Sequence, residues 1–209
     1  AVKNVAVGHA TLSADTLGNA SVAIGHDALR QQNFTTATNV YNTAVGFAAG
    51  ENVTTGIKNT IIGGLTGDAL TDADYNTAMG YSALTADTMG SKSTAIGYQA
   101  LLVQNFSTAT DSNNTAVGYN AGVAVSTGIG NTLVGSEAGD ALTSGGYSTA
   151  VGKGALSTED GHSNNVAVGY EALRDLNAGA DGYNTAVGNI AGRELTTGLQ
   201  NTLIGARSG

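Results

Sequence analysis

The chain has 209 residues and is acidic, with a formal net charge of −8 and only 8 Lys and Arg residues. No basic cluster offsets the repulsion from a phosphate backbone, so we expect no nucleic-acid partner. Cys is absent, which excludes disulfides and thiolate metal sites, and no apolar run approaches the roughly 20 residues that span a bilayer. We therefore expect no membrane insertion by this segment.

One glycine recurs along the whole chain directly after an aliphatic residue, as in NTAVG. Most of its intervals equal that from Gly63 to Gly80, and the others are slightly longer. A longer period of four intervals is also present, because Gly8 is as far from Gly80 as Gly80 is from Gly152. We therefore expect a single repeat domain over 1–209, built of three four-coil cassettes at 1–72, 73–144 and 145–209. The recurring glycines are Gly8, Gly25, Gly46, Gly63, Gly80, Gly97, Gly118, Gly135, Gly152, Gly169, Gly188 and Gly205.

A short strand is predicted before each of these glycines. In the segment 114–118, Thr115 and Val117 share one face, and Asn114 and Ala116 share the other, because side chains alternate along a strand. Equivalent residues recur in every coil, too often to leave room for helices. We expect an all-β parallel solenoid of twelve coils, each with two short strands and two turns. The β-branched face is expected to belong to the core, and the Ala/Gly face to be covered by another copy of the chain.

The position four residues after the glycine alternates as Leu, Leu, Gly, Gly through each cassette. Interiors are close-packed, so we expect larger residues elsewhere to fill the space that each missing Leu leaves. Even so, each coil offers few large apolar side chains, which points to an oligomer and leaves dimer and trimer open. The expected space-filling residues are Ile57, Ile61, Ile129, Leu133, Leu199 and Leu203.

Several segments resemble known fibre repeats over essentially the whole chain. SVAIG (21–25), STAIG (93–97), STAVG (148–152) and NVAVG (165–169) resemble the head repeats of YadA-like trimeric autotransporter adhesins. NTAVGYNAG (114–122) and the related segments 55–63, 127–135 and 197–205 are similar to repeats that precede the chaperone domain of viral tail-fibre proteins. The resemblance implies a left-handed parallel β-roll, a side-by-side homotrimer and a role in attachment. The adhesin heads have shorter coils, so the turns here are longer.

The longest turns occur once per cassette, at residues 30–41, 102–113 and 174–183. Insertions in solenoids project to one face, which is often the binding face. The alternative is that the Phe residues cap the thin core. The eight Tyr residues fall in two columns, which suits either glycan stacking or structural stacking, and we favour the latter. The candidate receptor-contact residues are Asn33, Phe34, Asn105, Phe106, Asn177 and Asp181.

Other clusters are interpreted as structural. Asp68, Asp72 and Asp74 crowd one turn and have the oxygen ligands that Ca²⁺ prefers, but a solvated acidic turn is favoured. Asp160, His162 and Ser163 are neighbours in sequence, which is not the geometry of a catalytic triad. The Asn/Ser column is expected to bond to the backbone of the next coil. We expect no enzyme activity, catalytic residue, cofactor or metal.

The sequence therefore predicts a structural and receptor-binding segment of an extracellular fibre, on a virion tail or a bacterial surface. Its partners are expected to be two further copies of the chain and a glycan or protein receptor on a host. Two alternatives stay open. An ice-binding solenoid requires a flat Thr ladder, and the predicted ladder shares its face with Val. A polysaccharide-degrading β-helix requires convergent carboxylates in a groove, which the columns lack.

Overall fold

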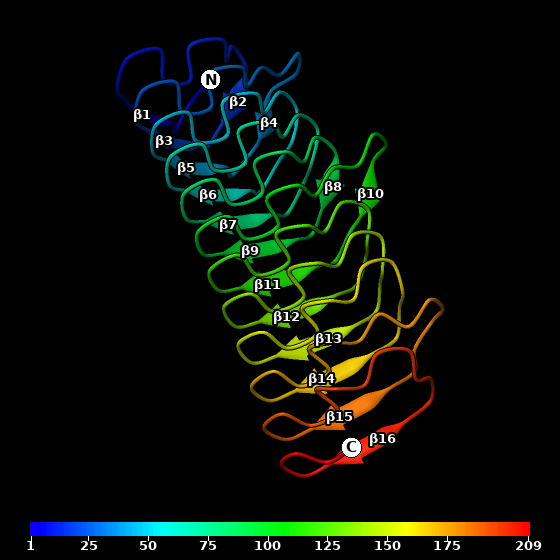
Figure 1. Cartoon of the computed structure of the whole chain (residues 1–209). Helices are drawn as coiled ribbons and strands as arrows, with labels where there is room; N and C mark the ends of the chain where they lie inside the picture. Colours follow the sequence, from blue (N-terminus) through cyan, green and yellow to red (C-terminus); the bar gives the residue numbers. More distant parts are fainter.

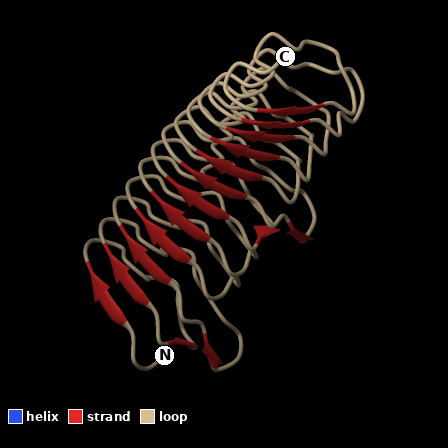
Figure 2. Cartoon of the chain, turned by 90° about the horizontal axis from the view of Figure 1, so that it is seen from below, coloured by secondary structure: helices blue, strands red, loops and turns tan.

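The computed structural model describes residues 1–209, and its regular secondary structure is entirely β-strand. Twelve three-residue strands pair side by side and in parallel, in chain order, and each one ends just before a recurring glycine (Figures 1 and 2). The chain is thus a parallel β-solenoid of about twelve coils, as predicted. The strands of this sheet are β1 (Val5–Val7), β3 (Val22–Ile24), β5 (Thr43–Val45), β6 (Thr60–Ile62), β7 (Thr77–Met79), β9 (Thr94–Ile96), β11 (Thr115–Val117), β12 (Thr132–Val134), β13 (Thr149–Val151), β14 (Val166–Val168), β15 (Thr185–Val187) and β16 (Thr202–Ile204).

The pairing is in register throughout, so each column seen in the sequence is a column in space. Thr115, for example, lies between Thr94 on one neighbouring strand and Thr132 on the other. The longer coils keep the same register as the shorter ones because their extra residues are accommodated in turns, away from the sheet. The structure contains no helix with the length and hydropathy needed to cross a lipid bilayer.

The prediction of two strands in every coil was wrong. A second strand forms at two places only, where β2 (Gly18–Asn19) pairs with β4 (Thr38–Asn39) and β8 (Gly90–Ser91) pairs with β10 (Thr110–Asp111). Each pair joins the start of one coil to the end of a long turn in the next. In the remaining coils this side consists of stacked turns joined by single backbone hydrogen bonds, such as that from the N–H of Gln200 to the carbonyl of Gly182 at 2.7 Å.

The two faces of the main sheet are the reverse of those predicted. Where the middle residue of a strand is Ala, it points into the coil and is fully buried, from Ala23 to Ala186, and only Ala6 in the first strand is exposed. A second Ala column, such as Ala100 and Ala172, and the Leu residues four after the glycine complete this thin interior. The β-branched residues instead point out of the coil. The interior is too narrow for β-branched side chains on the strand when Leu already enters from the opposite turn.

The space left where Gly replaces Leu is filled as predicted, but by only one of the two large apolar residues expected to do so in each cassette. Ile61 is fully buried, and its side chain occupies the space beside Gly50, where an added Cβ would lie 2.8 Å from Ile61 Cδ1. Leu133 does the same at Gly122. The other expected members, Ile57, Ile129 and Leu199, lie in turns outside the core, and Leu199 is 44% exposed. Their assignment to the core was wrong.

The Asn/Ser column forms the expected ladder between coils. The side-chain oxygen of Asn42 accepts a hydrogen bond from the backbone N–H of Asn59 at 2.8 Å, and Asn59 does the same for Asn76 at 2.9 Å. Each amide also donates to a backbone carbonyl further along the chain, as Asn59 Nδ2 does to Ala73 at 2.7 Å. These side chains are buried, and because both ends of the amide are used, the ladder fixes the spacing of successive turns.

Candidate interaction surfaces

The outward face of the twelve-stranded sheet is the largest regular surface of the molecule. It carries two columns, one of Thr or Val and one of aliphatic residues, and no charged residue lies in either. Its side chains are half-buried or exposed along the whole solenoid: Met79 is 40% exposed in the middle of the sheet and Val7 is 57% exposed near its end. A continuous uncharged surface with a column of partly exposed aliphatic side chains is typical of an interface with another protein.

The long turns project beyond the neighbouring coils along one edge of the solenoid (Figure 1). Their exposed tips are residues 35–37, 107–109 and 179–181, which are small and carry one charge, on Asp181. Of the predicted contact residues, Phe34 and Phe106 are tucked under the turns, at 7% and 8% exposed, so they pack against the coil. The tips of these turns instead present small residues and polar residues to solvent.

The predicted polar contact residues also anchor the turns. Asn33 Oδ1 accepts a hydrogen bond from the Thr16 hydroxyl at 3.0 Å, and Asn105 has the same bond to Thr88. Asp181 accepts the backbone N–H of Ser163 at 3.0 Å. Asn177 is exposed, and its backbone N–H donates to the carbonyl of Thr196 at 2.7 Å. The three turns therefore do not converge on one site but form three separate sites along the edge.

A buried polar network beneath the long turns was missed from the sequence. Asp87 is fully buried and accepts hydrogen bonds from Gln104 Nε2 at 2.5 Å and from the backbone N–H of Gly90 at 2.9 Å. One cassette earlier, Asp15 and Gln32 form the same pair at 2.9 Å. Gln32 also accepts from Asn42, and Gln104 from Asn114, so each Gln links the carboxylate to the Asn ladder where the coil lengthens.

The third cassette replaces this pair with a different one. Glu159 takes the place of the Asp and Leu176 that of the Gln, and both are fully buried. The buried carboxylate of Glu159 is instead paired with His162, whose Nδ1 lies 2.8 Å from its Oε1. The third long turn, which lacks the Phe, is therefore anchored by a hydrogen-bonded Glu–His pair rather than by the Asp–Gln pair.

Comparison with protein-family models, with curated proteins and with solved structures finds no match. The functional interpretation therefore depends on the surfaces of this chain and on the resemblance of its repeats.

The Tyr residues that follow the glycine stack on one another. Tyr81, Tyr98 and Tyr119 on successive coils have ring centroids 5.9 and 5.4 Å apart and nearly parallel planes. Both faces of Tyr98 are thus covered by its neighbours, which leaves only ring edges for a ligand. The expected stacking is thus present for three of the four Tyr residues in this column. In the other column, Tyr75 is contacted by Lys58, whose Nζ lies 4.8 Å from the ring centroid.

The acidic turn does not gather its carboxylates around one point. Asp72 accepts a hydrogen bond from Thr55 and Asp74 one from the backbone N–H of Ile57, each in the preceding coil. Groups of three His or acidic residues come together at two other places, one around His9 and one around His162. The Ser163 hydroxyl accepts the N–H of Gly146 at 3.0 Å and makes no bond to His162. No pocket opens at this or any other place on the surface.

Buried carboxyl groups give the fold a specific dependence on pH. Burial raises the pKa of Asp87, and its hydrogen bonds lower that pKa only in part. Burial likewise raises the pKa values of Asp68, Asp74 and Asp140, whereas Arg174 lowers that of Asp175. A carboxyl group whose pKa is higher in the folded than in the unfolded chain stabilises the fold when protonated. That contribution is fully present below the unfolded value of 3.8 and is lost as the pH rises through the folded-state pKa.

The solenoid is therefore expected to be more stable at pH 4.5 than at pH 7.5, as measured by the midpoint of urea unfolding. Asp87→Asn removes one of the titrating groups and is expected to reduce the difference between the two pH values. Glu194→Gln changes an exposed carboxylate and provides the control. A midpoint that rises steadily from pH 4.5 to pH 7.5 in the original chain would contradict the assignment.

Proposed function

We propose that the chain is a structural and receptor-binding segment of a trimeric extracellular fibre that mediates attachment, as in a phage tail fibre or a bacterial adhesin head. The observation that carries this proposal is the outward sheet face, which carries a column of aliphatic side chains beside the Thr column, has no charged residue and is open from β1 to β16. A chain with a net charge of −8 repels its own copies over most of its surface. On this face no charge opposes the approach of a second copy.

The arrangement of the copies follows from the regularity of the face. Its rungs repeat at the spacing of parallel strands, roughly 4.8 Å, so two copies fit closely only when their long axes lie side by side. Each rung then meets an equivalent rung, and the half-exposed Val, Ile and Met side chains become buried. The resemblance of segments such as STAIG (93–97) to adhesin head repeats favours three copies over two.

With the sheets facing inward in such a trimer, the long turns lie at the outer surface. Their tips, at 35–37, 107–109 and 179–181, are the segments that project furthest and the least involved in packing. A fibre with three chains presents nine such tips, and many weak contacts of this kind together give strong attachment. We assign receptor contact to these tips, and the role of the buried Phe34 and Phe106 is to hold two of the turns in place.

Attachment is tested with the fluorescently labelled assembly on intact bacterial and animal cells and on immobilised glycans. The variant that combines Thr36→Lys and Thr108→Lys, at two tips one cassette apart, is expected to bind at least tenfold more weakly, with no change in the mass of the assembly. Lys in place of Ser13, an exposed residue outside the long turns, is the control and is expected to bind as the original chain does. Binding that is equal in all three proteins would contradict the assignment to the tips.

One observation favours a second function, ice binding. Thr and Val of the Thr-x-Val pattern were expected in the core, but both residues lie on the outward face, as for Thr115 and Val117. A flat array of Thr and Val is the kind of surface that this activity requires. If the face is buried between copies, no thermal hysteresis is expected, and hysteresis in a monomeric protein would favour the second function.

A further inference from the structure

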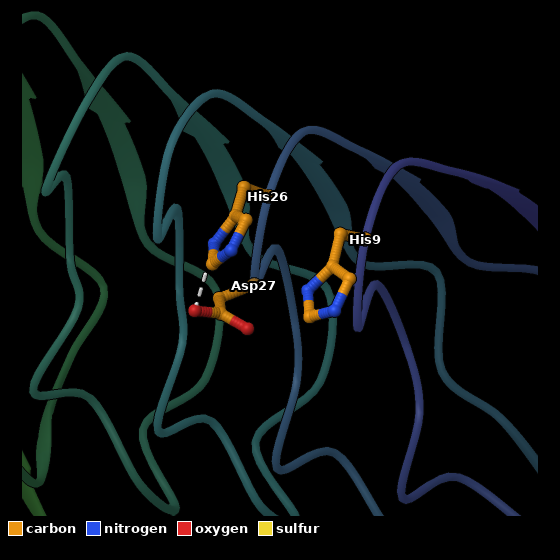
Figure 3. Close-up of side chains that lie close together, drawn as sticks. All are labelled: His9, His26 and Asp27. Carbon is orange, nitrogen blue, oxygen red and sulfur yellow. Dashed lines mark ion pairs between the residues drawn. The ribbon is translucent and has the colours of Figure 1, made fainter.

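Two of the three histidines in the chain lie on adjacent coils in the same column. His9 and His26 are separated by the length of one coil, and each follows a recurring glycine. Their rings are stacked, with centroids 4.9 Å apart and planes inclined by 18° (Figure 3). Phe47 stacks on the other side of His26 at 5.5 Å and restrains its ring. Both imidazoles are accessible to solvent, since the side chain of His26 is 49% exposed and His9 is exposed as well.

Asp27 fixes the orientation of one of these rings. Its Oδ2 lies 2.8 Å from Nδ1 of His26, and its backbone N–H donates to the carbonyl of His9 at 3.0 Å (Figure 3). A carboxylate that accepts the Nδ1 proton leaves the lone pair of Nε2 free, which is the usual arrangement around a histidine that binds a metal ion. The ligand atoms of His9, His26 and Asp27 all lie within 4.8 Å of one another.

We propose that His9 and His26 bind a divalent transition-metal ion of the Zn²⁺ or Cu²⁺ class, with Asp27 as the residue that positions His26. Imidazole nitrogens suit these ions, whereas Ca²⁺ and Mg²⁺ require oxygen ligands. One nitrogen of each ring binds the ion, and water completes its coordination. The in-plane lone pairs of two nearly parallel rings do not meet at one ion, so the exposed His9 ring at the end of the stack turns toward Nε2 of His26 when the ion binds. Because the two histidines belong to different coils, the bound ion links the coil of β1 to the coil of β3. This inference does not depend on the proposed attachment function.

The second group of this type has a different role. Glu159 is fully buried, its Oε1 is paired with His162 and its Oε2 accepts the N–H of Ala178 at 3.4 Å. A single imidazole is present there, and it is hydrogen-bonded to a carboxylate that the fold has buried. His162 therefore provides an internal control, because its replacement is expected to alter the third long turn but not binding of the metal ion.

The test is calorimetric titration of the tag-free chain with ZnCl₂ at pH 7.5. One Zn²⁺ per chain is expected, with an affinity at least tenfold weaker in His9→Ala and in His26→Ala. Asp27→Asn is expected to weaken binding by about tenfold, the usual effect of losing a group that orients a histidine. His162→Ala is expected to bind as the original chain does, and excess Mg²⁺ is expected not to compete.

Two further readouts separate this site from unspecific binding at the surface. With Cu²⁺, electron paramagnetic resonance is expected to record two nitrogen ligands in the original chain and one in His9→Ala. Hydrogen exchange of the N–H groups that join the first two coils, such as that of Gly25, is expected to slow when Zn²⁺ is added. The absence of Zn²⁺ binding, or binding that survives in the variant with both His9→Ala and His26→Ala, would overturn the proposal.

Discussion

Replacement of Gly97 by Ala is expected to destabilise the solenoid by about 3–5 kcal/mol, through combined backbone strain and steric overlap. Gly97 has φ +134°, a conformation that residues with a Cβ rarely adopt. An added Cβ would also overlap the carbonyl group of Gly118 in the next coil. Neither atom can move without breaking the register of the sheet, because the same contact recurs at the corresponding glycine of every interior coil.

Two other glycines separate strain from overlap. Gly64 has an ordinary φ, and a Cβ there would meet only the ring of Tyr81 at 3.6 Å, so Gly64→Ala is expected to change the stability by less than about 1 kcal/mol. Gly205 has φ +118° but no atom within 4 Å of an added Cβ, so Gly205→Ala reports strain alone, about 1–3 kcal/mol. Urea unfolding followed by circular dichroism orders the three variants. Equal midpoints for Gly97→Ala and Gly64→Ala would show that the stacked glycines are not required by the fold.

Lysine on the outward sheet face is expected to separate the copies of the proposed trimer. Met79 and Val151 occupy the same column one cassette apart, so Met79→Lys with Val151→Lys places two ammonium groups on this face. In a single chain both groups reach water. Between copies each is buried without a partner, at a cost of several kcal/mol per group, which the apolar contacts do not offset.

Val103→Lys is the matched control for this pair. Val103 is 41% exposed, about as much as Met79, but lies in a long turn away from the sheet. It is expected to leave the assembly intact, whereas the variant with two face substitutions is expected to be a folded monomer with an unchanged circular dichroism spectrum. If the face variant keeps the mass of the original assembly, the copies meet on another surface.

The coil count and the register could be predicted because the glycine is required at one fixed place in every coil. The contact between Gly97 and Gly118 leaves no room for a side chain, so glycine must occupy this position in every coil. A glycine that recurs at a fixed place is easily recognised in the sequence. The same holds for Ile61 and Gly50, where a gain of volume at one position matches a loss at another. Both contacts join fixed positions of neighbouring coils, so they can be inferred from the repeat pattern even when the conformation of the turns is unknown.

The direction of the two sheet faces could not be predicted in the same way. Alternation identifies which residues share a face, but an Ala column suits a thin interior as well as a close contact between chains. The outcome depends on how far Leu residues such as Leu29 and Leu101 reach across the coil from the opposite turn. Once they fill the interior, only Ala fits on the strand, and residues such as Ile96 are left to face outward.

The buried pair of Asp87 and Gln104 could have been recognised from its recurrence in the sequence. Asp15 and Gln32 stand one cassette earlier at the same positions, so the pair is visible at the four-coil period. His9 and His26 could likewise be found by reading the column that follows the glycine. In both cases the spacing between coils, rather than the local sequence, brings the partners together.

The mass of the assembled chain in solution tests the central claim most directly. Sedimentation equilibrium or light scattering at micromolar concentration is expected to give three times the chain mass of 20.7 kDa, with the sheet faces buried against one another. A folded chain that remains at 20.7 kDa at micromolar concentration would contradict the proposal that the outward face joins the copies.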